Sequence, residues 1–340
     1  MRRFIKFVLI VLLVAVGAML VFKYQLFREV STRKLHLRNL RIGYQPSTHQ
    51  IAHMIAMKKG WWKEDLKKHG IEKVTEYEFP SGPPEMTAML AGELDIAYVG
   101  TAPPITAIYE GLDAKIVAGV QTQGSNLVLR PGVNFKGVHD LKGLKIATFP
   151  PGSIQDTILR KWLIDNNVDP DEDIEIIAMG PGDAISALKA KAIDGAFLPH
   201  PAPAVIELEK SGEMAISSGE MWPNHACCCL LVRGELIRNN PDLVKDIIKV
   251  HIRATEYAMM YPDEAADIFA QKTGWDIEKI KYSLNTWDGK WISDPHMEIE
   301  STLEFAKVIY NLTKPRYGHL LTKEDIFNTS FYDKIIKENQ

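Results

Sequence analysis

Short apolar runs alternate with amphipathic segments from Leu40 into the middle of the chain. Runs that suit buried strands are Leu40–Tyr44, Val74–Phe79, Leu94–Val99 and Lys115–Val120. The segments between them have apolar residues at helical spacing, and they are Thr48–Lys59, Pro84–Ala91 and Pro103–Tyr109. Strands that alternate with helices predict an α/β fold with a mostly parallel sheet, covered on both faces.

The same pattern occurs a second time. Residues Thr87–Pro104 align with Ser186–Pro203 at a constant offset of 99, with Asp95 and Asp194 among the identical pairs. Upstream, Leu40–Pro46 aligns with Leu144–Pro150 at an offset of 104. Two matches in the same order predict two similar α/β lobes, and only two copies exist, so the chain is not a solenoid.

The C-terminal third reads as helices alone. We predict helices over Pro241–Met260, Pro262–Lys272, Asp276–Thr286 and Ile299–Leu312, packed back on the first lobe. The chain would then cross between lobes twice, near Leu127–Pro131 and Cys227–Leu231. The predicted division is an N-terminal signal or anchor with its linker over residues 1–34, a first lobe of 35–128 plus 229–340, and a second lobe of 129–228.

A membrane-directed segment is predicted at the N-terminus. The sixteen residues Phe7–Phe22 carry no charge and follow Arg2, Arg3 and Lys6. This length lies between the apolar core of a signal peptide and a thin membrane-spanning helix. No cysteine precedes Cys227, so a lipoprotein anchor is not expected. We expect the body of the chain to be extracytoplasmic, either anchored through this segment or released.

Charge argues against nucleic acid as a partner. The 340 residues have a net charge of −3, but the first 38 contain eight basic residues and one acidic residue, so the other 302 carry −10. Nucleic-acid binding requires a basic surface, and an acidic body does not provide one.

Polar loops rich in Gly and Pro follow the predicted strands, where open α/β sheets bind ligands. These loops are Gln45–His49, Pro80–Pro84, Gly100–Pro104, Gln121–Ser125, Pro150–Gln155 and Leu198–His200. Ser153 opens one helix and Thr101 precedes another. Free N–H groups and the helix dipole at such positions favour a negatively charged ligand. Each residue alone is also explained by simple helix capping.

The loops contain no Lys or Arg, so the predicted ligand is a small oxyanion held by amides, hydroxyls and histidines. His49, His200 and His225 are the potentially cationic donors; if His200 is charged, affinity should fall above about pH 6.5. Trp222 is the expected aromatic contact. The candidate ligand-binding residues are Thr48, His49, Thr101, Gln123, Ser153, Ile154, Gln155, His200, Trp222 and His225.

Metal, cofactor and catalytic interpretations find little support. Cys227, Cys228 and Cys229 are consecutive and lack a CxxC pair. On a regular strand Cys227 and Cys229 would face one way and Cys228 the other, so the three thiolates could not converge. We therefore expect buried structural cysteines and no metal site. Nucleophile-elbow, zinc-protease, P-loop and dinucleotide motifs are also absent from the sequence, so we expect neither an enzyme nor a bound cofactor.

Four stretches resemble the nitrate/sulfonate/taurine substrate-binding proteins of ABC importers. They are Phe79–Pro84, Gly92–Pro104, Val138–Ala147 and Trp222–Cys228, within a similarity that spans roughly residues 40–310. The resemblance implies a two-lobed periplasmic-binding-protein fold of the second type, a small anion as ligand, and a permease with its ATPase as partners. It also implies that Thr48, His49, Thr101, Ser153, Gln155 and His200 line the cleft, although many members have an acidic or aromatic residue where this chain has His200.

Two other interpretations remain open. Pyrimidine synthases of thiamin biosynthesis resemble the same fold and carry a cysteine-rich run with a catalytic His, and a binding protein for a pyrimidine precursor would share that site. This chain lacks the fourth Cys of that run, and an export signal argues against a cytoplasmic enzyme. The second interpretation is a membrane-tethered sensor domain.

Overall fold

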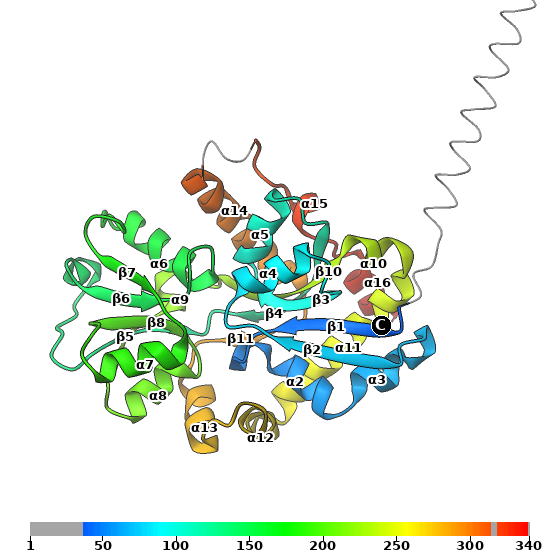
Figure 1. Ribbon diagram of the computed structural model, residues 1–340, viewed down its shortest axis with the longest axis horizontal. Coiled ribbons are helices and arrows are strands. Elements are labelled where there is room, and N and C mark those ends of the chain that lie inside the picture. Colours follow the sequence, from blue (N-terminus) through cyan, green and yellow to red (C-terminus); the bar gives the residue numbers. More distant parts are fainter. Residues whose placement is uncertain (1–36, 314–317, 339–340) are drawn as a thin grey trace, which may run out of the picture.

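The computed structural model describes residues 37–313 and 318–338. The predicted membrane-directed segment, residues 1–22, lies outside these ranges. Within them, no helix combines the length and the apolar character that crossing a bilayer requires. The described residues form two α/β lobes side by side, each built on its own sheet (Figure 1).

The first lobe contains a six-stranded sheet in the order β11-β4-β10-β3-β1-β2. Its strands are β1 (Asn39–Tyr44), β2 (Lys73–Glu78), β3 (Ile96–Gly100), β4 (Ala114–Thr122), β10 (Ala226–Arg233) and β11 (Lys290–Trp291). Strand β1 pairs in parallel with both β2 and β3, whereas β10 is antiparallel to both β3 and β4.

The second lobe contains a five-stranded sheet in the order β7-β6-β8-β5-β9. Its strands are β5 (Ser125–Leu129), β6 (Lys145–Thr148), β7 (Glu175–Ala178), β8 (Gly195–Pro199) and β9 (Glu213–Ser217). Strand β6 is parallel to β7 and β8, and β5 is antiparallel to β8 and β9. Each sheet therefore has four strands that run in one direction, β1 to β4 in the first lobe and β6 to β9 in the second, and one antiparallel strand that arrives from the other lobe. The short strand β11 is also antiparallel to its neighbour β4.

These crossing strands make both sheets mixed, although most strands of each sheet are parallel, as the sequence predicted. Strand β5 starts with Ser125 paired to Pro199, the last residue of β8, and β10 has Cys228 paired to Gly100, the last residue of β3. A strand that enters at the carboxyl end of its neighbour has to run antiparallel to it. The crossings lie at residues 123–124 and 218–225, a few residues before the predicted stretches, so Ser125–Leu129 belongs to the second sheet and Cys227 and Cys228 to the first.

The internal repeat has a structural basis in two equivalent aspartates. The Asp95 carboxylate accepts a hydrogen bond from the backbone N–H of Arg41 at 2.9 Å, and the Asp194 carboxylate accepts one from the N–H of Lys145 at 2.9 Å. Each carboxylate also pairs with an arginine, Arg41 in the first lobe and Arg130 in the second. Each Asp thus joins the loop before β3 or β8 to the equivalent strand of its lobe, β1 in the first and β6 in the second.

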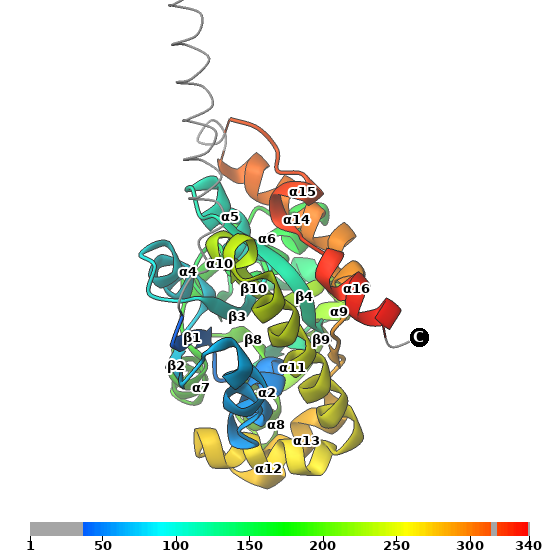
Figure 2. The same ribbon diagram turned by 90° about the vertical axis from the view of Figure 1, so that its right-hand side faces the viewer.

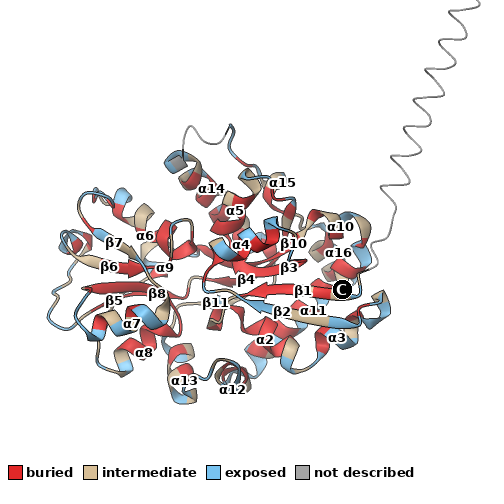
Figure 3. Cartoon of the chain, viewed as in Figure 1, coloured by how far each residue is buried: buried red, intermediate tan, exposed pale blue. Residues whose placement is uncertain are grey.

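Helices cover both sheets, and the central strands such as β3, β5 and β8 are buried (Figure 3), whereas β2, β7 and β9 are intermediate or exposed. The first lobe carries α2 (Ile51–Lys58), α3 (Trp61–Leu66), α4 (Gly82–Leu90), α5 (Ala102–Tyr109), α10 (Gly234–Asn239), α11 (Pro241–Met260), α12 (Pro262–Thr273), α14 (Ile299–Thr313), α15 (Lys323–Ile326) and α16 (Ser330–Glu338). The second lobe carries α6 (Ile154–Asp165), α7 (Pro181–Lys189), α8 (Ala202–Leu208) and α9 (Ser218–Met221).

The C-terminal helices follow the sequence prediction closely, with one difference in packing. Helix α11 packs on α2, α3 and α16 of the first lobe (Figure 2). Helix α13 (Ile277–Thr286) packs on α12 of the first lobe and also on α8 of the second lobe. There Lys279 binds the Glu209 carboxylate at 2.6 Å and the Tyr282 hydroxyl donates to Glu207 at 2.7 Å. The C-terminal region therefore joins the two lobes.

We expect Asp95→Ala and Asp194→Ala each to lower the free energy of unfolding by about 1–3 kcal/mol. Each substitution removes the carboxylate acceptor and leaves the backbone N–H of Arg41 or Lys145 without its partner. Urea denaturation would measure this loss. Glu72→Ala serves as the control, because its carboxylate is 61% exposed and pairs with Arg38 on the surface, so it should cost less than about 1 kcal/mol. Equal losses in all three variants would contradict a special role for the repeated aspartates.

Candidate functional site

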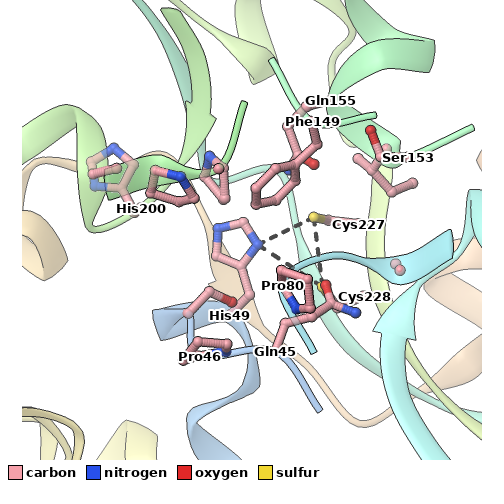
Figure 4. Close-up of a pocket in the computed structure, with 18 of the residues that line it drawn as sticks. Gln45, Pro46, His49, Pro80, Phe149, Ser153, Gln155, His200, Cys227 and Cys228 are labelled. Atoms are coloured by element: carbon pink, nitrogen blue, oxygen red, sulfur yellow. Dashed lines mark hydrogen bonds between the residues drawn. The ribbon is translucent and has the colours of Figure 1, made fainter. Parts of the chain in front are cut away.

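A cavity of about 240 Å³ lies between the two lobes, at the carboxyl ends of their parallel strands. Figure 4 shows residues of both lobes around it. First-lobe segments contribute Gln45, Pro46, Ser47, His49, Pro80, Gly82, Gly100, Pro103, Cys227, Cys228 and Trp275. Second-lobe segments contribute Phe149, Ser153, Ile154, Gln155, Gly180, Pro181, Gly182, Asp183, Pro199, His200, Pro201 and Ala202.

Five α-helices begin at this cavity. Residues of the first turn of α4 and α5 line it from the first lobe, and those of α6, α7 and α8 line it from the second. The first N–H groups of a helix have no partner within the helix, and the dipole places positive charge there. The helix dipoles therefore place partial positive charge at the cavity without a charged side chain. The N–H donors come from residues such as Gly82, Ile154 and Gly182, because Pro103 and Pro181 have none.

Glycine allows the lobes to come this close. A Cβ at Gly100 would lie 2.8 Å from Cγ1 of Ile154, which is the first residue of α6 in the opposite lobe. A larger residue at position 100 would push the start of α6 away from the end of β3. The close approach brings the starts of α5 and α6 to the same cavity.

The described lining residues include no Lys or Arg, as the sequence predicted. Asp183 is their one carboxylate, at the exposed start of α7. Apolar surface comes from Phe149, Ile154 and Trp275, together with several prolines. A ligand here would meet both polar groups, amides and hydroxyls, and hydrocarbon surface.

Five of the ten predicted residues line the cavity, namely His49, Ser153, Ile154, Gln155 and His200. The Ser153 hydroxyl accepts a hydrogen bond from the Asp156 N–H at 3.3 Å, so it caps α6 as well. Gln155 donates from its amide to the Ser125 hydroxyl at 3.1 Å. Both side chains thus stand at the start of α6, beside the first residue of the crossing strand β5.

His200 is a neutral hydrogen-bonding residue, where the sequence left open that it is a cationic donor. Its ring is buried, with Nδ1 2.7 Å from the Ser283 hydroxyl and Nε2 2.9 Å from the Asn126 side-chain oxygen. Burial and the neighbouring His49 lower the pKa of His200 to about 3. The ring is therefore neutral at physiological pH, and its two nitrogens join α13 to β5.

The other five predicted residues lie outside the described lining. The Thr48 hydroxyl donates to the backbone oxygen of His200 at 3.1 Å, which links the lobes. Gln123 donates to Asp288 at the first crossing. Trp222 packs on Phe305. Two more are fully buried: Thr101, whose hydroxyl has no partner among the described residues, and His225, whose pKa burial lowers to about 4.

Sequence reasoning missed the loop Gly180–Asp183, although a signal for it existed. Helix α7 begins at Pro181 and α4 at Gly82, so the 99-residue offset of the repeat extends to these helix starts. Applying that offset to the predicted loop Pro80–Pro84 would have indicated 179–183. No comparable signal indicated Trp275, which reaches the cavity only because α13 packs across the lobes.

The cysteines differ from the regular strand that the sequence predicted. The pairing of β10 with β4 slips between Ala226 and Cys228, where two residues on β10 advance the pairing by one on β4. Such a bulge turns the extra residue, Cys227, out of strict alternation. As a result Cys227 Sγ and Cys228 Sγ lie 3.8 Å apart on the same side, while burial raises the pKa of the separate Cys229 thiol.

His49 faces these two thiols across the floor of the cavity (Figure 4). Its Nδ1 lies 3.3 Å from Cys227 Sγ and 3.9 Å from Cys228 Sγ. Its Nε2 lies 2.8 Å from the backbone oxygen of Gly124, which can only accept. Nε2 therefore carries the proton, and Nδ1 directs its lone pair at the thiols.

Asp288 holds both chain crossings. Its carboxylate accepts hydrogen bonds from the backbone N–H of Gly124 at 2.8 Å and of Gly219 at 2.7 Å. Gly124 has a φ of +84° and a Cβ there would meet the His49 ring, so glycine suits this position on both grounds. One carboxylate thus fixes the two strands that connect the lobes.

Comparison with known proteins gives the same architecture. The sequence model of the NMT1-like family matches residues 33–273. A Bacillus subtilis (strain 168) protein named "Putative aliphatic sulfonates-binding protein" is 27% identical over 309 residues, which cover 89% of this chain and 90% of that protein. A binding protein of Brucella abortus (strain 2308) is 33% identical over 246 residues, 72% of this chain and 73% of its own.

A solved structure of similar fold is the alkanesulfonate-binding protein SsuA from Xanthomonas axonopodis pv. citri, bound to MOPS. It aligns with a TM-score of 0.74 at 20% identity and covers 86% of this chain and 99% of its own. The predicted fold, with two similar lobes of the periplasmic-binding-protein type, is confirmed.

We expect the neutral His200 to make folding sensitive to acid. Its pKa is about 3 in the folded state and about 6.5 when unfolded, so between these values the unfolded chain binds the extra proton. This contribution to stability is fully present above about pH 6.5 and is lost as pH falls. Between pH 5 and 6, His200→Gln should reduce the pH slope of the unfolding free energy by on the order of 1 kcal/mol per pH unit.

Urea denaturation at several pH values would measure that slope. The control is His139→Gln, which alters an exposed ring that is solvated in both states. A His200→Gln slope equal to that of the unmodified chain would contradict the neutral, buried state of His200.

Proposed function

The chain belongs to the NMT1-like family, and from its cavity we propose that it is the solute-binding protein of an ABC importer. It binds a small organic sulfonate between the lobes and presents it to a permease driven by an ATPase. The observation that carries this proposal is the convergence of five helix N-termini from both lobes on one cavity with no Lys or Arg among its described lining residues. Relatives named for aliphatic sulfonates or nitrate support the same class of ligand.

Helix N-termini without cationic side chains suit a strong-acid anion. A sulfonate stays ionised at any physiological pH and spreads its charge over three oxygens, so several N–H groups can each bind part of it. Releasing such a ligand to a permease is easier than releasing one clamped by arginine, because no desolvated ion pair has to be broken.

The apolar side of the cavity favours an organic sulfonate over nitrate. Phe149, Ile154 and Trp275 offer contact area that a hydrocarbon tail fills and a bare inorganic anion does not. The volume of about 240 Å³ lies below the roughly 300–1,000 Å³ typical of drug-sized ligands, so the tail is short. The Asp183 carboxylate at α7 would attract an amino group, which makes an aminosulfonate such as taurine a natural member of the class.

Delivery requires the cavity to lie outside the cytoplasm and to open. We place the body there through the predicted N-terminal segment, as a membrane-anchored or released protein. Opening would separate contacts that now join the lobes, such as the Thr48 hydroxyl to the His200 carbonyl. Bound ligand would stabilise the closed form, because its oxygens contact helix starts of both lobes.

We expect calorimetry to detect binding of ethanesulfonate and taurine by the chain without added metal, and weaker binding of nitrate. Because His200 is neutral throughout, the affinity for ethanesulfonate should be the same at pH 6 and pH 8, unlike that of a site with a titrating histidine. Binding only of uncharged pyrimidines would overturn the proposal and favour the alternative, a pyrimidine-precursor binding protein or a related synthase.

A second prediction separates the cavity from its buried surroundings. Ser153→Ala removes a hydroxyl at the start of α6 and should weaken sulfonate binding by about 1 kcal/mol, or up to ~3 if the hydroxyl donates to the charged ligand. Thr101→Ala is the matched control, because this hydroxyl is fully buried and does not line the described cavity, so affinity should not change. The reverse order of effects, measured by calorimetry on folded variants, would contradict this assignment of the site.

A further inference from the structure

The cluster of His49, Cys227 and Cys228 has the geometry of a metal site. Tetrahedral zinc with sulfur ligands at about 2.3 Å and a nitrogen ligand at about 2.0–2.1 Å requires sulfurs about 3.8 Å apart and nitrogen–sulfur distances of about 3.5 Å. The observed separations are 3.8 Å between the sulfurs and 3.3 and 3.9 Å from Nδ1 to each sulfur. One ion therefore fits at bonding distance from all three atoms without a movement of the backbone.

We infer that His49 Nδ1, Cys227 Sγ and Cys228 Sγ form a binding site for a thiophilic metal ion, with Zn²⁺ as the best match, whose fourth position faces the cavity between the lobes. The three atoms lie within 4.8 Å of one another, and their residues line the cavity.

The surroundings of His49 support this assignment independently. A metal-binding histidine commonly donates its second N–H to a backbone carbonyl, which fixes the tautomer and aims the other nitrogen at the metal. Here Nε2 donates to the Gly124 carbonyl at 2.8 Å and leaves the Nδ1 lone pair directed at the thiols. Gln50 places its side-chain amide 3.9 Å from Cys228 Sγ, where it can donate weakly to a thiolate.

Charge balance favours a divalent ion. All three residues are almost completely buried, with exposed fractions of 1–4%, so an uncompensated charge here would be costly. Two thiolates and a neutral imidazole neutralise Zn²⁺, and binding releases the thiol protons to solvent. Three protein ligands leave one coordination position open, and the cavity is where water or an anion can reach it.

The test uses the full-length chain, purified without an affinity tag, in detergent and under a phosphine reductant that does not bind metal. Titration with Co²⁺ should give one equivalent with visible bands of tetrahedral cobalt and a thiolate-to-cobalt charge-transfer band, and Zn²⁺ should displace it. His49→Ala, Cys227→Ser and Cys228→Ser should each weaken zinc binding by roughly 100-fold or more. Losing a residue that only hydrogen-bonds to a metal ligand costs up to about 100-fold, and losing the ligand itself should cost at least as much.

Cys229→Ser is the matched control, because it removes a neighbouring, equally buried thiol of the same strand that lies outside the cluster. It should bind zinc as the unmodified chain does. Equal loss in Cys229→Ser, or an unmodified chain that is folded and reduced but gives no cobalt spectrum, would overturn the site.

Two further measurements complete the test. If a cysteine variant does not fold, zinc should still protect Cys227 and Cys228 of the unmodified chain from alkylation, read by mass spectrometry, and failure to protect them would overturn the site. Azide should shift the visible cobalt bands if the fourth position is open, and unchanged bands would overturn that part. Neither measurement uses a sulfonate, so the metal site and the proposed transport function can fail separately.

Discussion

The two crossings of the chain between the lobes are the constraint on which the rest of the structure depends. Each crossing strand enters the new sheet at the carboxyl ends of its parallel strands, so β5 and β10 begin where the helices α4 to α7 also begin. The first residues of the crossing strands, Ser125 and the pair Cys227 and Cys228, are thereby fixed beside the cavity or on its floor. Asp288 then binds the N–H groups of Gly124 and Gly219 and holds both crossings with one carboxylate.

The cavity obtains its electrostatic character from the backbone. Helix starts supply partial positive charge, while the buried histidines are kept neutral by desolvation, with a pKa of about 3 for His200 and about 4 for His225. A neutral imidazole can connect two elements through its two ring nitrogens, as His200 does between Ser283 and Asn126. The histidines thus connect elements, and the charge that attracts a ligand comes from aligned peptide dipoles that do not titrate.

The sequence predicted the features that depend on neighbouring residues, such as the ends of helices. Helix α11 begins and ends at Pro241 and Met260 as predicted, because a proline at its start and a regular apolar stripe define it. The repeat located both lobes, and its shared aspartates have the same role in each. The features that the sequence did not indicate depend on distant partners. The bulge at Cys227 arises from pairing with β4, and the hydroxyl of Thr48 is directed by a carbonyl 152 residues away.

His49 shows how one side chain can serve several of these constraints. It lies in the short 3-10 helix Thr48–Gln50 after β1. It binds the Gly124 carbonyl at the first crossing through Nε2 and faces the two thiols of β10 through Nδ1. Its ring also lies 5.8 Å from that of Trp287, next to Asp288. A change in how the first crossing is held would therefore rotate or shift the imidazole that faces Cys227 and Cys228. The contacts that hold the two lobes together and the arrangement of the cysteine cluster therefore depend on each other. Both require the His49 ring in the tautomer that donates from Nε2 to Gly124.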